Sequence, residues 1–542
     1  MSDSTISRRE LMRRGGALGG ALAFPAVLRG GTQAPSTPPA AAGGSAALRA
    51  GADIYGSIGV RPLINARGTF TIISGSTMLP EVRAAMDAAA QKYVHLDELT
   101  EAVGARLAAL TGAEWGLVSN GCSAGLTLAT AACVAGGNPD LHIRLPDLSG
   151  FPKDEAIVPA HSRNVYDAAL RSLGVRIVEV TTMAEFEAAL GPRVAMIYIL
   201  AGPNADNSPL SVKAIAPLAQ AKKVPIVVDA AAEILTIPNV HLQNGATLVA
   251  YSGGKCLRGP QTAGLLLGRK DLVRAAWVHS APHHGVMRSL KVGKEDAIGM
   301  LMAVEMWVKR DHDAEWKRWT GWLDHIAGRV SRVPGITTTV VQPEGLSNRT
   351  PSLRILWDRE QLGIGGDVVA RLLFDGSPRI TLNATRGPAE MGPTGQTGVS
   401  VTPYMLAPGD GRIVAERLVA ILSKPPAQAP PSAPAAPALD LTGQWNVRVQ
   451  YAAATSTHSL HLTQKGNEIG GFHKGEFITR EVTGTIDGDA VRLRSAFSEQ
   501  HGDAINLTFA GKVTGSEMGG ALDMGEYLGA TWTATRRESR RT

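Results

Sequence analysis

Short apolar runs rich in β-branched residues alternate with longer amphipathic segments between about residue 53 and residue 424. The runs predict strands at residues 115–119, 156–159, 176–180, 194–200, 225–229, 247–252 and 262–268. The amphipathic segments predict helices, among them residues 79–93, 101–110 and 211–221. Strands that alternate with helices are typical of an α/β fold in which helices cover both faces of a mainly parallel sheet.

A long helical pattern at residues 294–330, broken near its middle, ends a large domain that we place at residues 53–330. A smaller α/β domain follows at residues 331–424. The helical stretch contains four tryptophans, and we expect their rings to pack against neighbouring helices rather than to contact a cofactor. These are Trp307, Trp316, Trp319 and Trp322.

The pattern changes after a linker at residues 425–438, which contains six prolines and otherwise mostly alanine. Residues 439–537 show short alternating runs at 444–451, 459–464, 482–486, 490–496, 505–513 and 529–535. Glycine and aspartate between the runs indicate hairpins, so this part is predicted to be an antiparallel β sandwich or barrel. It carries no catalytic motif, and we interpret it as a binding or stabilising module rather than a second enzyme.

Residues 1–34 resemble a twin-arginine export signal, because Arg8 and Arg9 precede a Gly/Ala-rich apolar run at residues 15–28. That run is short for a membrane span, although an uncleaved anchor is an alternative to cleavage. Residues 35–52 are rich in Pro, Ala and Gly and are predicted to be a spacer. We therefore expect a periplasmic or exported protein with no membrane association apart from the signal.

The amino-acid composition limits the kinds of partner and cofactor that we expect. Hydrophobic residues make up 44% of the chain and charged residues 19%, which is typical of globular proteins. The formal charge is only +6 and the basic residues cluster at the two ends, so we expect no nucleic-acid groove. Three cysteines exclude a disulfide scaffold. His283 and His284 have no carboxylate at a ligand spacing, so we expect no metal site.

The strongest chemical motif follows the predicted strand at residues 247–252, where Ser252, Gly253 and Gly254 lead into Lys255. A lysine at a strand end reaches the cleft at the carboxyl edge of the sheet. Burial there favours the neutral amine, which forms an imine with an aldehyde. Ser252 is placed to hydrogen-bond a phosphate. The motif is weak by itself, because such a lysine is more often an ordinary surface residue.

An earlier predicted strand, at residues 225–229, ends in Asp229. The carboxyl ends of strands are where α/β folds bind ligands. A carboxylate at that position keeps the pyridine nitrogen of pyridoxal 5′-phosphate (PLP) protonated. Ala231 is small enough to let a flat ring lie against the backbone. The alternative is that Asp229 only caps a helix.

Two further segments add to the pattern. The strand at residues 115–119 runs into Gly121, Cys122 and Ser123 and then a helix of small residues, whose free amides form an anion site suited to phosphate. His161 follows the strand at residues 156–159, and its flat ring is suited to stacking on a pyridine, with a packed polar role as the alternative. The glycine motifs of dinucleotide and P-loop sites are absent from the sequence.

Taken in order, the phosphate loop, the histidine, the strand-end aspartate and the strand-end lysine resemble the aminotransferase-like fold-type I PLP enzymes. The likeness is greatest to the bacterial selenocysteine synthase group, including D-glucosaminate-6-phosphate ammonia-lyase-like proteins. It covers residues 53–424 and rests on segments 63–68, 110–114, 161–167, 228–233, 251–255 and 287–295.

The resemblance implies that Lys255 carries PLP as a Schiff base, that Asp229 pairs with the pyridine nitrogen and that His161 stacks on the ring. The cofactor-binding residues it implies are Gly121, Cys122, Ser123, His161, Asp229, Ala231, Ser252 and Lys255. Members of this fold are usually homodimers or larger homo-oligomers that share active sites. By analogy, we expect Thr262 or Arg288 to serve a neighbouring subunit.

We therefore expect a PLP-dependent lyase or transferase acting on a small amine, an amino acid or amino sugar acid, and we favour elimination. A racemase, an aldolase and an aminotransferase are alternatives, because each of these reactions begins when the substrate amine replaces Lys255 on PLP. A non-catalytic exported binding protein that keeps the PLP fold is an alternative from another class. Export argues against selenium transfer to a cytoplasmic tRNA. Candidates for binding the substrate carboxylate are Arg386, Arg354 and Arg288.

Overall fold

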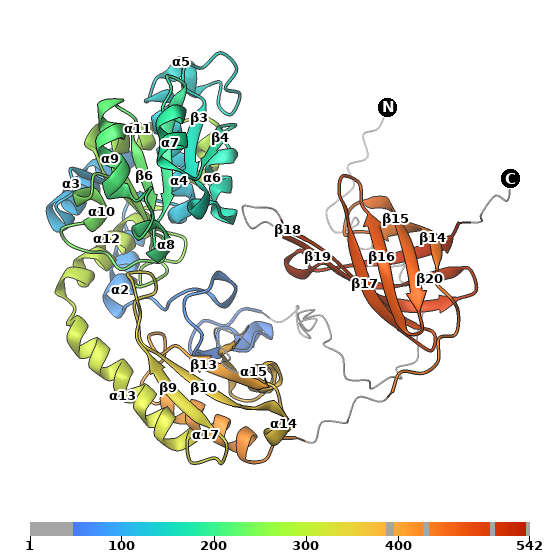
Figure 1. The fold of residues 1–542 in the computed structure, drawn as a ribbon. Helices are drawn as coiled ribbons and strands as arrows, with labels where there is room; N and C mark the ends of the chain where they lie inside the picture. Colours follow the sequence, from blue (N-terminus) through green and yellow to red (C-terminus); the bar gives the residue numbers. More distant parts are fainter. Residues whose placement is uncertain (1–46, 386–394, 427–432, 499–503, 538–542) are drawn as a thin grey trace, which may run out of the picture.

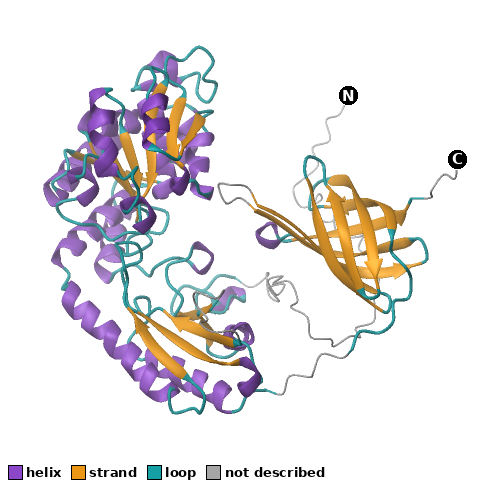
Figure 2. Ribbon diagram, viewed as in Figure 1, coloured by secondary structure: helices purple, strands orange, loops and turns teal. Residues whose placement is uncertain are grey.

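The computed structural model describes residues 47–385, 395–426, 433–498 and 504–537, which form a large α/β domain, a smaller α/β domain and a β barrel (Figure 1). The predicted signal at residues 1–34, part of the spacer, part of the proline-rich linker and Arg386 lie outside these residues. Figure 2 shows that the barrel is almost entirely strand, whereas helix and strand alternate in the rest of the chain.

The large domain is built on a seven-stranded sheet in the order β2-β8-β7-β6-β5-β3-β4. Every neighbouring pair is parallel except those of β8, which runs antiparallel to β2 and β7. The expected mainly parallel sheet is therefore confirmed. Its strands are β2 (Trp115–Ser119), β3 (Glu155–Pro159), β4 (Arg176–Val180), β5 (Val194–Leu200), β6 (Ile226–Asp229), β7 (Leu248–Ser252) and β8 (Gly264–Gly268).

Helices bury an apolar core on each face of this sheet. One core contains Leu126, Leu170 and Val273 from the first group of helices, and the other contains Leu107 and Met300 from the second. Strands covered on both faces must be apolar throughout, as β5 is. The first group is α4 (Gly121–Ala135), α6 (Ala168–Arg171) and α11 (Lys270–Val278); the second is α3 (Leu96–Thr111), α7 (Met183–Ala189), α9 (Val212–Ala221) and α12 (Lys294–Lys309).

The smaller domain has a four-stranded antiparallel sheet in the order β12-β13-β10-β9. Its strands are β9 (Thr337–Val341), β10 (Ser352–Asp358), β12 (Asn383–Ala384) and β13 (Gln396–Val401), and its core is completed by helices α13 (His312–Val330), α15 (Gly366–Asp375) and α17 (Asp410–Ser423). The predicted long helix is thus two helices, α12 and α13. Asp311 separates them and caps α13 by accepting a hydrogen bond from the Ala314 N–H at 2.9 Å.

The N-terminal segment belongs structurally to the smaller domain. Strand β1 (Leu63–Asn65) pairs in parallel with β11 (Arg379–Thr381), which lies far along the chain. The segment between β1 and α2 (Pro80–Ala90) then returns to the large domain, where the Ser76 N–H donates to the carbonyl of Gly254 at 2.9 Å. This segment therefore lines the space between the two domains.

The C-terminal part is a closed barrel of eight antiparallel strands in sequential order. Six of them match predicted runs, whereas β16 and β20 were not predicted from the sequence. Both contain adjacent glycines, Gly470–Gly471 and Gly519–Gly520, which are typical of turns. The strands are β14 (Gly443–Gln450), β15 (Thr455–Lys465), β16 (Glu468–Lys474), β17 (Thr479–Asp487), β18 (Ala490–Ser498), β19 (Ala504–Thr514), β20 (Glu517–Asp523) and β21 (Gly529–Arg536).

Within the described residues, no helix is both long and apolar enough to cross a membrane.

Replacement of Gly264 by alanine is expected to destabilise the large domain by about 2 kcal/mol, because its Cβ would lie 2.4 Å from the carbonyl carbon of Gly121, a backbone atom. Gly328→Ala is the matched control. Gly328 is exposed on α13 with open space around it, so alanine there should stabilise by about 1 kcal/mol. Denaturant unfolding followed by circular dichroism measures both. Equal effects of the two substitutions would contradict the close approach of β8 to α4.

Candidate active site

Asp229 lies at the carboxyl end of β6 and is only 2% exposed. Its Oδ1 accepts a hydrogen bond from the Ala231 N–H at 3.0 Å, and its Oδ2 accepts one from the Tyr198 hydroxyl at 3.0 Å. Burial raises the pKa of the Asp229 carboxyl, while these donors and the charge of Lys255 act in the opposite direction. A buried carboxylate in this state favours a partner that brings a proton and a positive charge.

Two residues that were not predicted hold this carboxylate from the side of β5. The Asn164 amide donates to the Tyr198 hydroxyl at 3.1 Å, and that hydroxyl donates to Asp229. Tyr198 is fully buried, and burial raises the pKa of its phenol, so it acts as a donor. The only sequence signal was a tyrosine within an otherwise apolar strand, since a buried hydroxyl needs a partner.

Cys122 approaches the same carboxylate from α4, with its Sγ 3.6 Å from Oδ1 of Asp229. Burial, followed by the negative charge of Asp229, raises the pKa of the Cys122 thiol well above its ordinary value. The thiol is therefore protonated. It serves as a small weak donor and not as a nucleophile.

Ser252, one of the residues predicted to bind phosphate, lies in a row of three residues that crosses three strands. Gly264 on β8 pairs with Ser119 of β2 on one side and with Ser252 of β7 on the other. A Cβ on Gly264 would lie 2.6 Å from the backbone nitrogen of Cys122, so the start of α4 lies against this row. No described side chain caps the start of α4, which leaves its first amides, including that of Ser123, for an anion.

Lys255 follows Ser252 after the glycine pair and is half-buried. The loop is fixed by hydrogen bonds from the Gly253 N–H to the carbonyl of Ala263 at 2.8 Å and from the Arg258 N–H to the carbonyl of Lys255 at 3.0 Å. The charge of Lys255 lowers the pKa of Asp229, so the two side chains lie within electrostatic reach. The predicted lysine and aspartate thus meet at one edge of the sheet.

His161 lies just beyond β3, in a short 3₁₀ turn. Its Nδ1 is 3.0 Å from the Ser162 hydroxyl oxygen, which accepts a hydrogen bond from the Leu200 N–H. Leu200 is paired with Asp229 in the sheet, so the histidine lies beside the aspartate strand. Its Nε2 is buried without a protein partner, and burial lowers the pKa of the ring, which favours the neutral imidazole.

The arginines proposed for the substrate carboxylate are not brought together by the described residues. Arg288 is exposed in the turn Val286–Leu290, and Arg386 lies outside the described residues. Arg354 is half-buried on β10 and does not line the large cavity described below. Thr262, the other residue expected to serve a neighbouring subunit, is exposed and donates to Asp296 at 3.3 Å.

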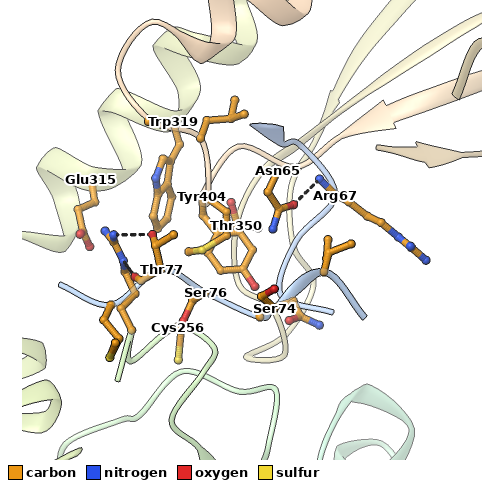
Figure 3. Close-up of a pocket in the computed structure, with 18 of the residues that line it drawn as sticks. Asn65, Arg67, Ser74, Ser76, Thr77, Cys256, Glu315, Trp319, Thr350 and Tyr404 are labelled. Atoms are coloured by element: carbon orange, nitrogen blue, oxygen red, sulfur yellow. Dashed lines mark hydrogen bonds between the residues drawn. The ribbon is translucent and has the colours of Figure 1, made fainter. Parts of the chain in front are cut away.

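A cavity of about 1560 Å³ opens between the two α/β domains beside the lysine loop (Figure 3). Asp229, Lys255 and His161 do not line this cavity. Ala232, which follows Asp229 closely in the chain, and Cys256, which follows Lys255 directly, do line it. Trp307, Trp316, Trp319 and Trp322 all line the cavity, while Trp307 also packs in the apolar core of the large domain and Trp322 against that of the smaller domain. Figure 3 shows Trp319 and Tyr404 facing the segment that contains Ser74, Ser76 and Thr77.

The wall of this cavity is strongly basic. Eight arginines line it against two carboxylates, Glu315 and Asp410. Arg310 is paired with Glu315 at 2.9 Å, whereas Arg258 donates only to Thr77, to its carbonyl at 2.9 Å and its hydroxyl at 3.1 Å. Burial, reinforced by the charge of Arg310, lowers the pKa of the Arg258 guanidinium. This excess of positive charge favours anionic ligands.

Comparison with known proteins decides the family. A model described as aminotransferase class-V matches residues 156–285. The chain is 31% identical over 330 residues to D-glucosaminate-6-phosphate ammonia lyase of Salmonella typhimurium, covering 59% of this chain and 86% of that protein. This chain belongs to the fold-type I PLP enzymes. Within them it falls in the group of the ammonia-lyase and the selenocysteine synthases, which confirms the predicted resemblance.

Two further matches agree with this assignment. The chain is 32% identical over 307 residues to 5'-C-glycyluridine monooxygenase-decarboxylase of a Streptomyces species, covering 55% of this chain and 75% of that protein. A solved structure of D-glucosaminate-6-phosphate ammonia-lyase covers 68% of this chain and 98% of its own, with a TM-score of 0.60 and 28% identity. The solved structure thus matches nearly all of its own chain and about two thirds of this one.

Membership of this family implies PLP as the cofactor, and the residues fit it. The buried Asp229 carboxylate suits a protonated pyridine nitrogen, and Nε2 of His161, just beyond β3, has no hydrogen-bond partner among the described residues. The uncapped start of α4 and Ser252 suit the phosphate. Lys255, half-buried after the glycine pair, would supply the amine that attaches the aldehyde.

Lys255→Ala is expected to abolish the visible absorbance band of the purified PLP enzyme and its loss on borohydride reduction, because the alanine variant has no amine to attach the cofactor. Lys213→Ala, on the exposed side of α9, is the control and should keep both. Absorbance spectra before and after borohydride are the measurement. A reducible band that survives in Lys255→Ala would assign the attachment to another lysine.

Tyr198→Phe removes a hydrogen bond that lowers the pKa of the Asp229 carboxyl, so the substitution should raise that pKa further. Pairing with the pyridine nitrogen needs the ionised carboxylate, so lowering the pH should weaken PLP binding when Asp229 takes up a proton. In the variant this loss of PLP affinity should begin at a higher pH than in the wild type. Titration of the apoenzyme with PLP at a series of pH values measures this.

Tyr251→Phe is the matched control for Tyr198→Phe. Tyr251 is also a buried strand tyrosine, but its hydroxyl accepts from Asn239 at 2.7 Å and does not contact Asp229. Its pH profile should match that of the wild type. The same displacement in both variants would show that a general loss of packing, and not the bond to Asp229, is responsible.

Proposed function

We propose that the protein is a PLP-dependent lyase that removes ammonia from an amino sugar acid or a similar β-hydroxylated amino acid. The observation that supports the proposal is that Asp229, Lys255 and Ser252 meet at one edge of the sheet, beside the basic cavity. The similarity to an ammonia-lyase over 86% of its length supports the reaction class.

The bound cofactor supplies an electron sink for the negative charge that develops when the substrate loses its α-proton. Asp229 would hold the proton on the pyridine nitrogen, which would keep that sink effective. The freed amine of Lys255 takes the α-proton, and as an ammonium it can return a proton to the departing β-hydroxyl group. Loss of water, followed by hydrolysis, converts the amino acid to a 2-keto acid and ammonia.

The basic cavity supports an acidic substrate. Its eight arginines outnumber its two carboxylates, and Arg258 lacks a charged partner within the described residues. A guanidinium suits carboxylate and phosphate oxygens equally in geometry. We therefore propose that the distal part of the substrate, which is acidic, extends from Lys255 into this cavity along Cys256 and Arg258. The half-buried tryptophans give the sugar carbons an apolar wall.

The oligomeric state and the location of the enzyme are part of the same proposal. We propose that the chain assembles as a homodimer or larger homo-oligomer, because Ser123 and Thr262 are exposed at the site and would be covered by a neighbouring subunit. We also propose export by the twin-arginine route, supported by Arg8, Arg9 and the apolar run that follows. That route carries folded proteins, which suits an enzyme that must take up PLP in the cytoplasm.

Incubation with D-glucosaminate 6-phosphate, D-glucosaminate and serine should yield ammonia and a keto acid in equal amounts without oxygen uptake. Lys255→Ala is the control and should yield neither, because it lacks the base. Coupled assays for ammonia and keto acid, an oxygen electrode and chiral chromatography are the measurements.

Each other outcome of this assay would replace the lyase with a named alternative. Inversion without keto acid would identify a racemase, and oxygen uptake with release of carbon dioxide an oxidative decarboxylase. A keto acid formed only with an amino acceptor would identify an aminotransferase, and an aldehyde product an aldolase. No turnover of any amine by the PLP-loaded protein would favour the binding protein.

A further inference from the structure

A tryptophan and an arginine at the end of α12 contact the two loops that carry Asp229 and Lys255. Helix α12 ends at Lys309, and Arg310 follows in an extended conformation, so its side chain leaves the helix. The Arg310 guanidinium lies over the Trp307 ring, 5.0 Å from the ring centre. Both side chains are almost completely buried. They therefore form a packed unit rather than two surface contacts.

Trp307 holds the loop that follows Asp229. Its indole Nε1 donates a hydrogen bond to the carbonyl of Leu235 at 2.7 Å. Cys256 contacts the same loop, because its Sγ donates to the carbonyl of Glu233 at 3.2 Å. The backbone that continues from the aspartate is thus fixed against both α12 and the loop that carries Lys255.

Arg310 holds the loop that carries Lys255. Its Nη1 donates to the carbonyl of Cys256, the residue directly after Lys255, at 3.1 Å. Burial raises the pKa of the Cys256 thiol to about 11, and the charge of Arg310 acts in the opposite direction, so this charge reaches the residue beside the lysine. A hydrogen bond from a charged donor is stronger than one between neutral groups. Arg310 therefore restrains the backbone from which the Lys255 side chain extends.

Glu315 of α13 keeps the Arg310 guanidinium in this orientation. Its two carboxylate oxygens accept hydrogen bonds from Nε at 3.1 Å and from Nη2 at 2.9 Å. A two-point contact of this kind fixes the plane of the guanidinium and leaves Nη1 for Cys256. The side chains are only 10% and 12% exposed, so water screens this pair less than a surface ion pair. Because α13 belongs to the core of the smaller domain, the lysine loop is linked to that domain.

Arg310 also lines the basic cavity, so an alternative role is to bind the substrate. All three of its guanidinium nitrogens already donate to protein groups, to Glu315 and to the Cys256 carbonyl. Arg258 differs, since it donates only to Thr77 within the described residues. The contacts of Arg310 thus favour a role toward the lysine loop over a role toward a ligand.

We propose that Arg310 is a positioning residue that holds Lys255 in place relative to Asp229 for the attachment of PLP. It acts through the Cys256 carbonyl, while Trp307 fixes the loop on the aspartate side. The inference rests on the attachment of PLP to Lys255 and is independent of the ammonia-lyase reaction proposed above. Attachment joins the lysine amine to the cofactor aldehyde with loss of water, and such a reaction slows steeply when the reacting groups are misplaced.

The test compares substitutions that keep the charge of this buried pair balanced. Removing Arg310 alone would leave the nearly buried Glu315 carboxylate without its guanidinium partner, which is costly. The double variant Arg310→Met with Glu315→Gln is therefore compared with Glu315→Gln. Arg310→Lys is the conservative variant, because an ammonium keeps the charge but cannot make the two-point contact. Arg318→Met is the control for loss of positive charge from the same cavity, since Arg318 is exposed on α13.

Stopped-flow absorbance after PLP is mixed with the full-length apoprotein measures how fast the visible band appears, without any substrate. We expect the double variant to form the band at least about ten-fold more slowly than Glu315→Gln. Arg310→Lys should be slowed less, and Arg318→Met should match the wild type. Calorimetry of the apoproteins shows which variants are folded. If the double variant is not folded, Arg310→Lys decides, and a rate equal to that of the wild type would overturn the inference.

The outcomes separate this inference from the proposed reaction. Equal rates in the double variant and in Glu315→Gln would overturn the positioning role and leave the lyase proposal standing. The same slowing in Arg318→Met would also overturn it, because the cause would then be the lost charge of the cavity. A wild type that forms no band would overturn the attachment of PLP itself. Normal band formation without turnover of any amine would count against the lyase alone.

Discussion

The buried carboxylate of Asp229 is the constraint on which the rest of the catalytic site depends. It lies at the end of an apolar strand, almost completely shielded from water, and burial disfavours its charge. Tyr198, Cys122 and the Ala231 amide supply donors but no positive charge, and the positive charge that acts on this carboxylate from the described residues is that of Lys255. A protonated pyridine nitrogen would add the positive charge that these donors lack.

Close backbone packing also fixes the position of the start of α4 relative to the sheet. Gly264 joins Ser119 and Ser252 in one row and leaves no room for a side chain against the start of α4. The anion site at α4 is therefore held at a set distance from the strand that ends in Asp229. A rigid arrangement of this kind suits a planar cofactor, whose ring and phosphate must be bound at the same time.

The sequence was sufficient to predict the fold and the meeting of Asp229 and Lys255 at one edge of the sheet, because strand ends in parallel sheets meet at one edge. Tyr198 and Asn164 could not be predicted, since their role depends on a register between strands distant in the chain. The residues that line the cavity could not be predicted either, because β1 joins the smaller domain by pairing with β11, which is distant in the sequence. Strands β16 and β20 were missed because their glycines, which allow the backbones to approach closely, have the composition of turns.

Burial of a carboxylate also links ligand binding to stability. Around Asp229, the Tyr198 hydroxyl, the Ala231 amide and the charge of Lys255 compensate part of the cost of burial, yet the pKa of the carboxyl stays above its ordinary value. A ligand that brings a proton and a positive charge to this carboxylate would bind the folded form and not the unfolded chain. Such a ligand would therefore stabilise the large domain, which bears the cost of the buried charge when the ligand is absent.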